Sequence, residues 1–183
     1  MEKTGDNIQA KNASWTFGGD VCDKFDEHVA KSVPLYAIGH DLVLKISDFF
    51  VNDASTCYEL GCSTGTLTHA LATRNAHKKA RFIGIDVEEP MINKAKELCK
   101  ECKSVTLKTT DVLDIEFEKS DLIVAYYTVQ FVKPKNRQLL RRCRDRQPDG
   151  RGDFENVGSL GLGDALERYE QCRRPSVLHW SLS

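Results

Sequence analysis

The chain has 183 residues, of which 40% are apolar and 29% are charged, and its formal net charge is −1. Such a composition is typical of a globular protein with one domain of ordinary size and a sizeable core. The near-neutral charge gives no electrostatic support for direct binding to nucleic acid or to an anionic membrane.

The N-terminus and the cysteines predict a cytoplasmic protein. The first six residues are polar, and no run approaches the ~20 apolar residues that span a bilayer. The seven cysteines have no framework spacing, so we expect reduced thiols. Cys99 and Cys102 form a C-x-x-C pair, but they follow a helical pattern and no second pair of ligands follows them, so we interpret both as helix residues and predict no metal.

The first part of the chain predicts an N-terminal arm and a helical cap. Residues 1–23 are the predicted arm. Apolar residues spaced three and four apart then predict helices over 24–32 and 34–50, with Pro34 near the start of the second helix.

Strand and helix patterns alternate after this cap. The predicted strands cover 57–60, 80–86, 105–111 and 121–127, and the predicted helices cover 66–74, 90–102 and 134 to about 140. Short links between such elements are typical of βαβ units and of a parallel sheet covered by helices on both faces. The predicted fold class is therefore α/β, with residues 24–140 as one Rossmann-like domain.

The composition changes sharply near residue 140. Residues 1–140 contain 15 Lys and 3 Arg, whereas residues 141–183 contain 8 Arg and no Lys. Isoleucine also disappears, and little apolar periodicity remains, so this Arg- and Gly-rich tail should pack weakly. It is a natural weakly ordered tail, an Arg-rich partner-binding extension, or a segment translated in another reading frame. We favour the last interpretation.

Three signals follow three successive predicted strands. Gly61 and Gly65 in the turn G-C-S-T-G allow the backbone to turn tightly and approach a ligand. Asp86 ends the second strand, where a carboxylate can accept hydrogen bonds from both hydroxyls of a ribose. Asp111, followed by Val112, ends the third strand and is suited to the exocyclic amine of adenine. Because the carboxyl ends of parallel strands share one edge, these signals together predict a nucleoside site.

The turn favours a methyl donor over a dinucleotide. A dinucleotide-binding dehydrogenase normally has a third glycine in the pattern G-x-G-x-x-G, where pyrophosphate meets a helix N-terminus. This chain lacks it, and Glu59 stands two residues before Gly61. A carboxylate there would repel phosphate but suits the cationic methionine end of S-adenosylmethionine.

Several motifs in order resemble one family. These motifs are W-T-F at 15–17, S-V-P-L-Y at 32–36, Y-E-L-G-C-S-T-G at 58–65, I-G-I-D at 83–86, P-M-I at 90–92 and T-V-Q-F-V at 128–132. Over residues 13–140 the chain resembles the carboxy-S-adenosylmethionine synthases, long described as tRNA wobble-uridine methyltransferases.

That resemblance implies a class I methyltransferase fold and a homodimer. It also implies binding of S-adenosylmethionine or carboxy-S-adenosylmethionine, with prephenate as the small-molecule substrate and tRNA wobble-uridine modification as the use of the product. The residues that it assigns to the cofactor pocket are Tyr36, Gly61, Cys62, Ser63, Asp86, Val87, Asp111 and Val112.

Two departures from the family leave alternatives open. The family has a cofactor-binding Asn where this chain has Tyr126, and its distal Arg for the added carboxylate has no match after residue 140. Only four strands are predicted, so the C-terminal strands of the fold are expected to be missing or replaced. The alternatives are a truncated, non-catalytic relative that binds S-adenosylmethionine and an ordinary methyltransferase with a small-molecule acceptor. No catalytic residue is identified from the sequence.

Overall fold

The computed structural model describes residues 10–11, 14–15, 21–137 and 176–180, with side-chain environments over 25–137. In chain order the elements are β1 (Ala10–Lys11), β2 (Ser14–Trp15), α1 (Val21–Ser32), α2 (Tyr36–Phe50), β3 (Thr56–Leu60), α3 (Thr66–Arg74), β4 (Arg81–Asp86), α4 (Glu89–Leu98), β5 (Val105–Thr109), β6 (Leu122–Tyr126), the 3-10 helix η1 (Val129–Phe131) and β7 (Ser176–Trp180). A further helical segment is described over 134–137.

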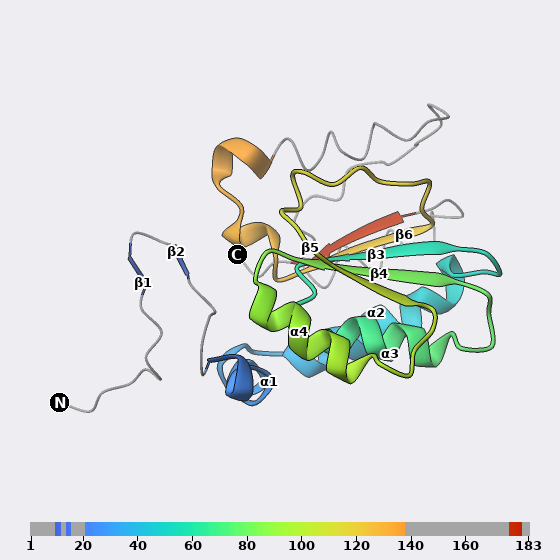
Figure 1. Ribbon diagram of the computed structural model, residues 1–183, viewed down its shortest axis with the longest axis horizontal. Helices are drawn as coiled ribbons and strands as arrows, with labels where there is room; N and C mark the ends of the chain where they lie inside the picture. The colour runs from blue at the N-terminus through green and yellow to red at the C-terminus, as the bar shows by residue number, and fades with distance from the viewer. Residues whose placement is uncertain (1–9, 12–13, 16–20, 138–175, 181–183) are drawn as a thin grey trace.

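The centre of the fold is a parallel sheet of five strands in the order β5-β4-β3-β6-β7 (Figure 1). β1 and β2 form a separate antiparallel pair. α3 forms the crossover from β3 to β4, and α4 forms the crossover from β4 to β5, because a parallel pair needs a crossover connection. The predicted α/β class and parallel sheet are confirmed.

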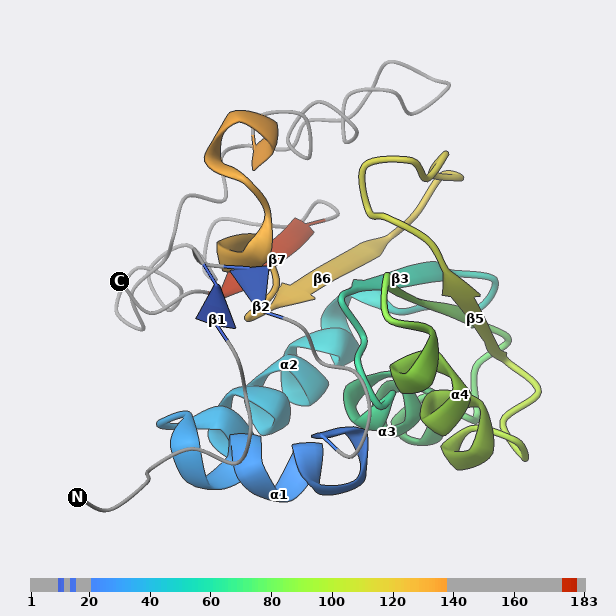
Figure 2. The ribbon, with the colours of Figure 1, turned by 60° about the vertical axis from the view of Figure 1, so that its left-hand side comes forward.

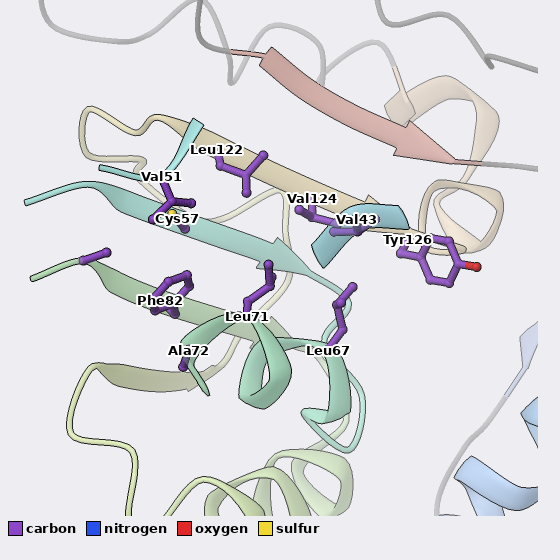
Figure 3. Close-up of a cluster of buried hydrophobic side chains, with 11 residues drawn as sticks. Val43, Val51, Cys57, Leu67, Leu71, Ala72, Phe82, Leu122, Val124 and Tyr126 are labelled. Atoms are coloured by element: carbon purple, nitrogen blue, oxygen red, sulfur yellow. The ribbon is translucent and has the colours of Figure 1, made fainter. Parts of the chain in front are cut away.

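The described helices α1 to α4 lie on one side of the sheet in both views (Figures 1 and 2). Because side chains alternate along a strand, every second residue faces these helices. Figure 3 shows Leu67 and Leu71 of α3 packed toward the strands. The buried cluster on this face consists of Val43, Val51, Cys57, Leu67, Leu71, Ala72, Ala80, Phe82, Leu122, Val124 and Tyr126.

The opposite face is packed by a segment without helix over 110–121, which differs from the prediction of helices on both faces. Leu113, Ile115 and Phe117 of this segment pack against Tyr58 and its buried neighbours. These three residues are spaced two apart, which is typical of an extended segment. An amphipathic helix would need apolar residues three and four apart. The Phe117 ring lies 5.1 Å from that of Tyr58, whose hydroxyl accepts the backbone N–H of Glu118 at 3.1 Å.

Three helix boundaries differ from the prediction by two or more residues. α1 begins at Val21, three residues before its predicted start. α2 begins at Tyr36, because Leu35 before it has a left-handed backbone with φ of 60°. α4 ends at Leu98, with the N–H of Cys99 donating to Ala95 as the cap. The interpretation of Cys102 as a helix residue is therefore wrong, since it lies beyond this cap. Within the described residues, no group of three or more His, Cys, Asp or Glu side chains is arranged to hold a metal.

β7 adds a fifth strand where four were predicted. Its backbone pairs with β6 in register from Leu122 with Ser176 to Tyr126 with Trp180. Without it, β6 would be an edge strand with a row of unpaired backbone groups, which favours addition of another strand. The predicted boundary after residue 140 and the character of residues 141–175 and 181–183 lie outside the described residues and stay predictions.

Over the described part of the chain, no helix has the length and apolar character that crossing a membrane requires.

Candidate functional site

The turn after β3 is fastened to the end of β4. The backbone N–H groups of Gly61 and Cys62 both donate to the carbonyl of Ile85, at 2.7 and 2.9 Å. Gly61 has a φ of 73°, and a Cβ on it would lie 2.5 Å from the side chain of Thr128. The Thr128 hydroxyl donates to the Leu60 carbonyl at 2.6 Å. Gly61 is therefore required both for its left-handed backbone and for the close approach of Thr128.

Asp86 is the last residue of β4, and its carboxylate is held by backbone N–H donors. Oδ2 accepts the N–H of Ser63 at 2.8 Å, and Oδ1 accepts the N–H of Glu88 at 2.9 Å. Burial raises the pKa of Asp86, while these N–H donors act in the opposite direction. Because the two carboxylate oxygens together offer about four acceptor sites, Asp86 can still accept a hydrogen bond from a ligand.

A cavity of about 700 Å³ lies beyond the carboxyl ends of the parallel strands. This is where open α/β sheets bind ligands, and the volume is in the range of small-molecule and cofactor sites. The structure brings eight of the predicted site residues to its lining, namely Tyr36, Gly61, Ser63, Asp86, Val87, Asp111, Val112 and Tyr126.

The other three predicted residues lie beside the cavity and not in its lining. Glu59 is buried and accepts the hydroxyl of Thr68, and burial raises its pKa to about 8. Cys62 is also buried, and burial raises the pKa of its thiol. Gly65 has a φ of 79°, and a Cβ on it would lie 2.7 Å from that of Ala95 in α4. In the structure these residues therefore pack between the sheet and the helices α3 and α4.

Asp111 lies two residues beyond β5, which ends at Thr109. Its Oδ1 accepts the backbone N–H of Leu113 at 2.9 Å, so the exposed carboxylate is held by its own turn. Val112 is 8% exposed and belongs to the buried cluster on the face opposite the helices. These two residues form the side of the cavity next to β5.

Tyrosine side chains form an aromatic wall of the cavity. The rings of Tyr36 and Tyr126 are 5.4 Å apart, and those of Tyr126 and Tyr127 are 4.7 Å apart. The Tyr126 hydroxyl donates to the carbonyl of Tyr36 at 2.9 Å, and a Cβ on Gly39 would lie 2.0 Å from that hydroxyl. His40 packs behind the wall, and burial lowers its pKa to about 4, so it is neutral at pH 7. Aromatic faces of this kind attract a cation.

Sequence reasoning missed several lining residues, chiefly those after β6. Gln130, Lys133 and Arg137 line the cavity together with Phe25 of α1 and Glu88. The sequence could have indicated part of this group, because the predicted parallel strands place the end of β6 at the same edge of the sheet as the end of β4. The sequence alone does not show that the chain turns back toward this edge after η1.

α1 is tied to the turn that follows β3. Oδ1 of Asp26 accepts the hydroxyls of Thr64 and Thr66, at 2.7 and 3.2 Å. The neighbouring Phe25 lines the cavity. Asp26 therefore positions one cavity wall.

Replacing Asp26 by alanine is expected to loosen α1. Because Asp26 is exposed, we expect a cost of about 1 kcal/mol, equivalent to roughly fivefold faster amide exchange over residues 21–32. Hydrogen exchange with mass spectrometry measures this, and β3 should keep its protection. Glu27→Ala, which breaks an exposed pair with Lys31 on the same helix, is the control. Equal exchange in the two variants would contradict the role of Asp26.

Comparisons with known proteins agree with this fold. The chain overlaps a solved structure from Methanococcus maripaludis, assigned to the S-adenosyl-L-methionine-dependent methyltransferases, with a TM-score of 0.56 at 23% identity, covering 76% of this chain and 61% of that one. A SAM-dependent methyltransferase from Aquifex aeolicus gives a TM-score of 0.50 at 20% identity, covering 66% and 65%. The fold is thus that of the Rossmann-like methyltransferases. The family described as methyltransferase domain matches residues 58–150, and the chain belongs to that family.

Among curated proteins the chain is similar to carboxy-S-adenosyl-L-methionine synthases, as its motifs predicted. It is 34% identical over 137 residues to that of Sulfurimonas denitrificans, covering 72% of this chain and 56% of the relative. It is 35% identical over 129 residues to that of Wolinella succinogenes, covering 68% and 52%. The chain therefore spans about half the length of the curated relatives that it matches.

Proposed function

We propose that the cavity binds S-adenosylmethionine and that the protein is a transferase of the carboxy-S-adenosylmethionine synthase type. In this proposal it converts S-adenosylmethionine and prephenate to carboxy-S-adenosylmethionine for tRNA wobble-uridine modification. The observation that carries the proposal is the Asp86 carboxylate, held by the N–H groups of Ser63 and Glu88 in the cavity lining. A fixed acceptor at the end of the second strand of a βαβ unit suits the ribose hydroxyls of a nucleoside.

The lining residues fit the parts of this cofactor. Asp86 offers acceptors to the ribose, and Asp111 offers a carboxylate to the adenine amine. Val87 and Val112 give apolar contact for the base, and the wall of Tyr36 and Tyr126 suits a sulfonium cation. When bound, the cofactor would supply a sulfonium methyl group whose carbon loses a proton and forms a new bond to the carboxyl group given up by prephenate. The role of the protein is to orient that group against the acceptor and to exclude water.

Replacing Asp86 by alanine is expected to weaken binding of S-adenosylmethionine by at least about 30-fold. The reason is the loss of hydrogen bonds to a charged acceptor, worth about 2 kcal/mol or more. Isothermal titration of the full chain measures this. Asp41→Ala is the control, because that carboxylate is 59% exposed and pairs with Lys45 on the outer face of α2. A folded parent that does not bind, or an Asp86→Ala variant that binds like the parent, would refute the cofactor site.

The second candidate is a relative that binds the cofactor without catalysis. It is favoured by Tyr126, which stands in the place of the family's Asn. Incubation of the protein with S-adenosylmethionine and prephenate, followed by mass spectrometry, separates the two candidates. A product carrying one added carboxyl group supports the synthase, and cofactor binding without product supports the second candidate. Transfer of the methyl group to another small molecule would instead support an ordinary methyltransferase.

The setting that we propose is a cytoplasmic homodimer that acts on a small molecule without binding nucleic acid directly. The free thiols of the described residues Cys57, Cys62, Cys99 and Cys102 support a reducing compartment. The net charge of −1 supports the absence of direct nucleic-acid binding. The homodimer rests on the family resemblance, and sedimentation of the full chain tests it.

A further inference from the structure

The charges that line the cavity are separated by sign. Its carboxylates lie at the ends of β4 and β5 or just beyond them, and they belong to Asp86, Glu88 and Asp111. Its cations follow β6 and belong to Lys133 and Arg137. Because the strand order is β5-β4-β3-β6, the two groups lie on opposite sides of β3. A ligand that fills the cavity therefore meets acceptors at one end and positive charge at the other.

Arg137 is held in place without a described anionic partner. Its Nε donates to the Val132 carbonyl at 2.8 Å, and one Nη donates to the Gln130 carbonyl at 3.0 Å. These two bonds use only part of a guanidinium that carries five N–H donors. The ion pairs of the described residues do not include Arg137. Its orientation is thus fixed, and its charge and remaining donors stay available to a ligand.

Lys133 adds a second positive charge four residues earlier. It is exposed and lines the cavity, and its ammonium has no ion pair among the described side chains. Lys135 lies between Lys133 and Arg137 in sequence but not in the cavity lining. The chain therefore offers a matched lysine that carries the same charge outside the cavity.

We propose that Lys133 and Arg137 determine specificity for an anionic acceptor by binding its carboxylate. The inference rests on the proposed function, since the acidic side of the cavity is assigned there to the cofactor. The planar guanidinium suits the two oxygens of a carboxylate, and the lysine ammonium adds a point charge. This pair lies in the described segment after β6 and is separate from the distal arginine that the family resemblance implies beyond residue 140.

The test is titration of the full-length protein with prephenate, in the presence and in the absence of saturating S-adenosylhomocysteine. Arg137→Gln is expected to weaken prephenate binding at least tenfold, and Lys133→Gln about three- to tenfold. Both variants should bind S-adenosylhomocysteine within about twofold of the parent, and Lys135→Gln should match the parent for both ligands. Lys133→Gln removes no hydrogen bond within the described protein, so it tests the pair even if Arg137→Gln disturbs the turn.

The possible results separate this proposal from the proposed function. Prephenate binding by the parent that both variants leave unchanged would overturn the proposal, and so would a parent that binds S-adenosylhomocysteine but not prephenate. Equal loss of both ligands in Arg137→Gln, with no effect of Lys133→Gln, would make Arg137 a structural residue and also overturn it. If the folded parent binds prephenate through this pair but never binds S-adenosylhomocysteine, the anion site stands and the proposed function falls.

Discussion

Glu59→Gln is expected to make the stability of the folded protein nearly independent of pH between pH 6.5 and 8. Burial raises the pKa of Glu59 to about 8, whereas the pKa of an unfolded Glu is about 4.3. Between these values the unfolded chain has lost this proton and the folded chain keeps it. The free energy of unfolding of the parent should therefore fall by about 1.4 kcal/mol per pH unit as pH rises, until Glu59 ionises in the folded state near pH 8.

The interval from pH 6.5 to 8 isolates this effect from His40. Burial lowers the pKa of His40 to about 4, so this residue adds stability as pH rises only up to its unfolded pKa of about 6.5. Above that pH the parent should lose about 2 kcal/mol through Glu59. Glutamine keeps an acceptor for the Thr68 hydroxyl but cannot ionise, and the variant should not show this loss.

Urea denaturation at several pH values measures this difference. Glu118→Gln is the matched control, because the Glu118 side chain is 57% exposed and pairs with Arg81 at the surface. It should keep the pH slope of the parent. Parallel stability curves for Glu59→Gln and the parent would show that Glu59 is ionised in the folded protein.

Gly65→Ala is expected to lower the free energy of unfolding by about 2–5 kcal/mol. An L-residue with left-handed backbone costs about 1–2 kcal/mol, and overpacking a close contact costs about 1–3 kcal/mol. Gly65 has a φ of 79°, and its added Cβ would lie 2.7 Å from the Cβ of Ala95. The variant should therefore push α4 away from the turn that begins α3.

A double-mutant cycle with Ala95→Gly separates the two contributions to this loss. Ala95→Gly alone costs about 1 kcal/mol of helix propensity. Combined with Gly65→Ala it should relieve the contact, so that the double variant loses less than the sum of the single variants. Denaturant unfolding should give a coupling of about 1 kcal/mol or more. Additivity within about 0.5 kcal/mol would mean that only the backbone of Gly65 matters.

Local patterns in the sequence were sufficient for most elements and for the position of Asp86 at the end of a strand. The predicted helix over 66–74 matches α3, and the predicted strands over 57–60 and 121–127 each match an observed strand within one residue at either end. Asp86 was expected at a strand end beside a glycine turn, and it ends β4 next to Gly61. These features depend on neighbouring residues along the chain, so hydrophobic spacing and turn residues are enough to reveal them.

The direction in which a side chain points could be determined only from the structure. Glu59 was expected to serve the ligand, but its side chain lies on the helix-covered face of β3 and is bonded to Thr68 of α3. Gly65 was expected to let a ligand approach the backbone, but in the structure it is the side chain of Ala95 that approaches it closely. The direction of a side chain follows from strand register and helix docking, which a single sequence does not specify.

The sequence by itself determined the α/β class, the family and the Asp86 end of the cavity, because each follows from motifs of a few consecutive residues. Only the tertiary structure decided that β7 closes the edge of β6 and that Lys133 and Arg137 face the cavity. Both depend on where the chain travels after β6. Pairing between distant segments is set by the backbone groups and surfaces that they satisfy together, and no local pattern contains that information.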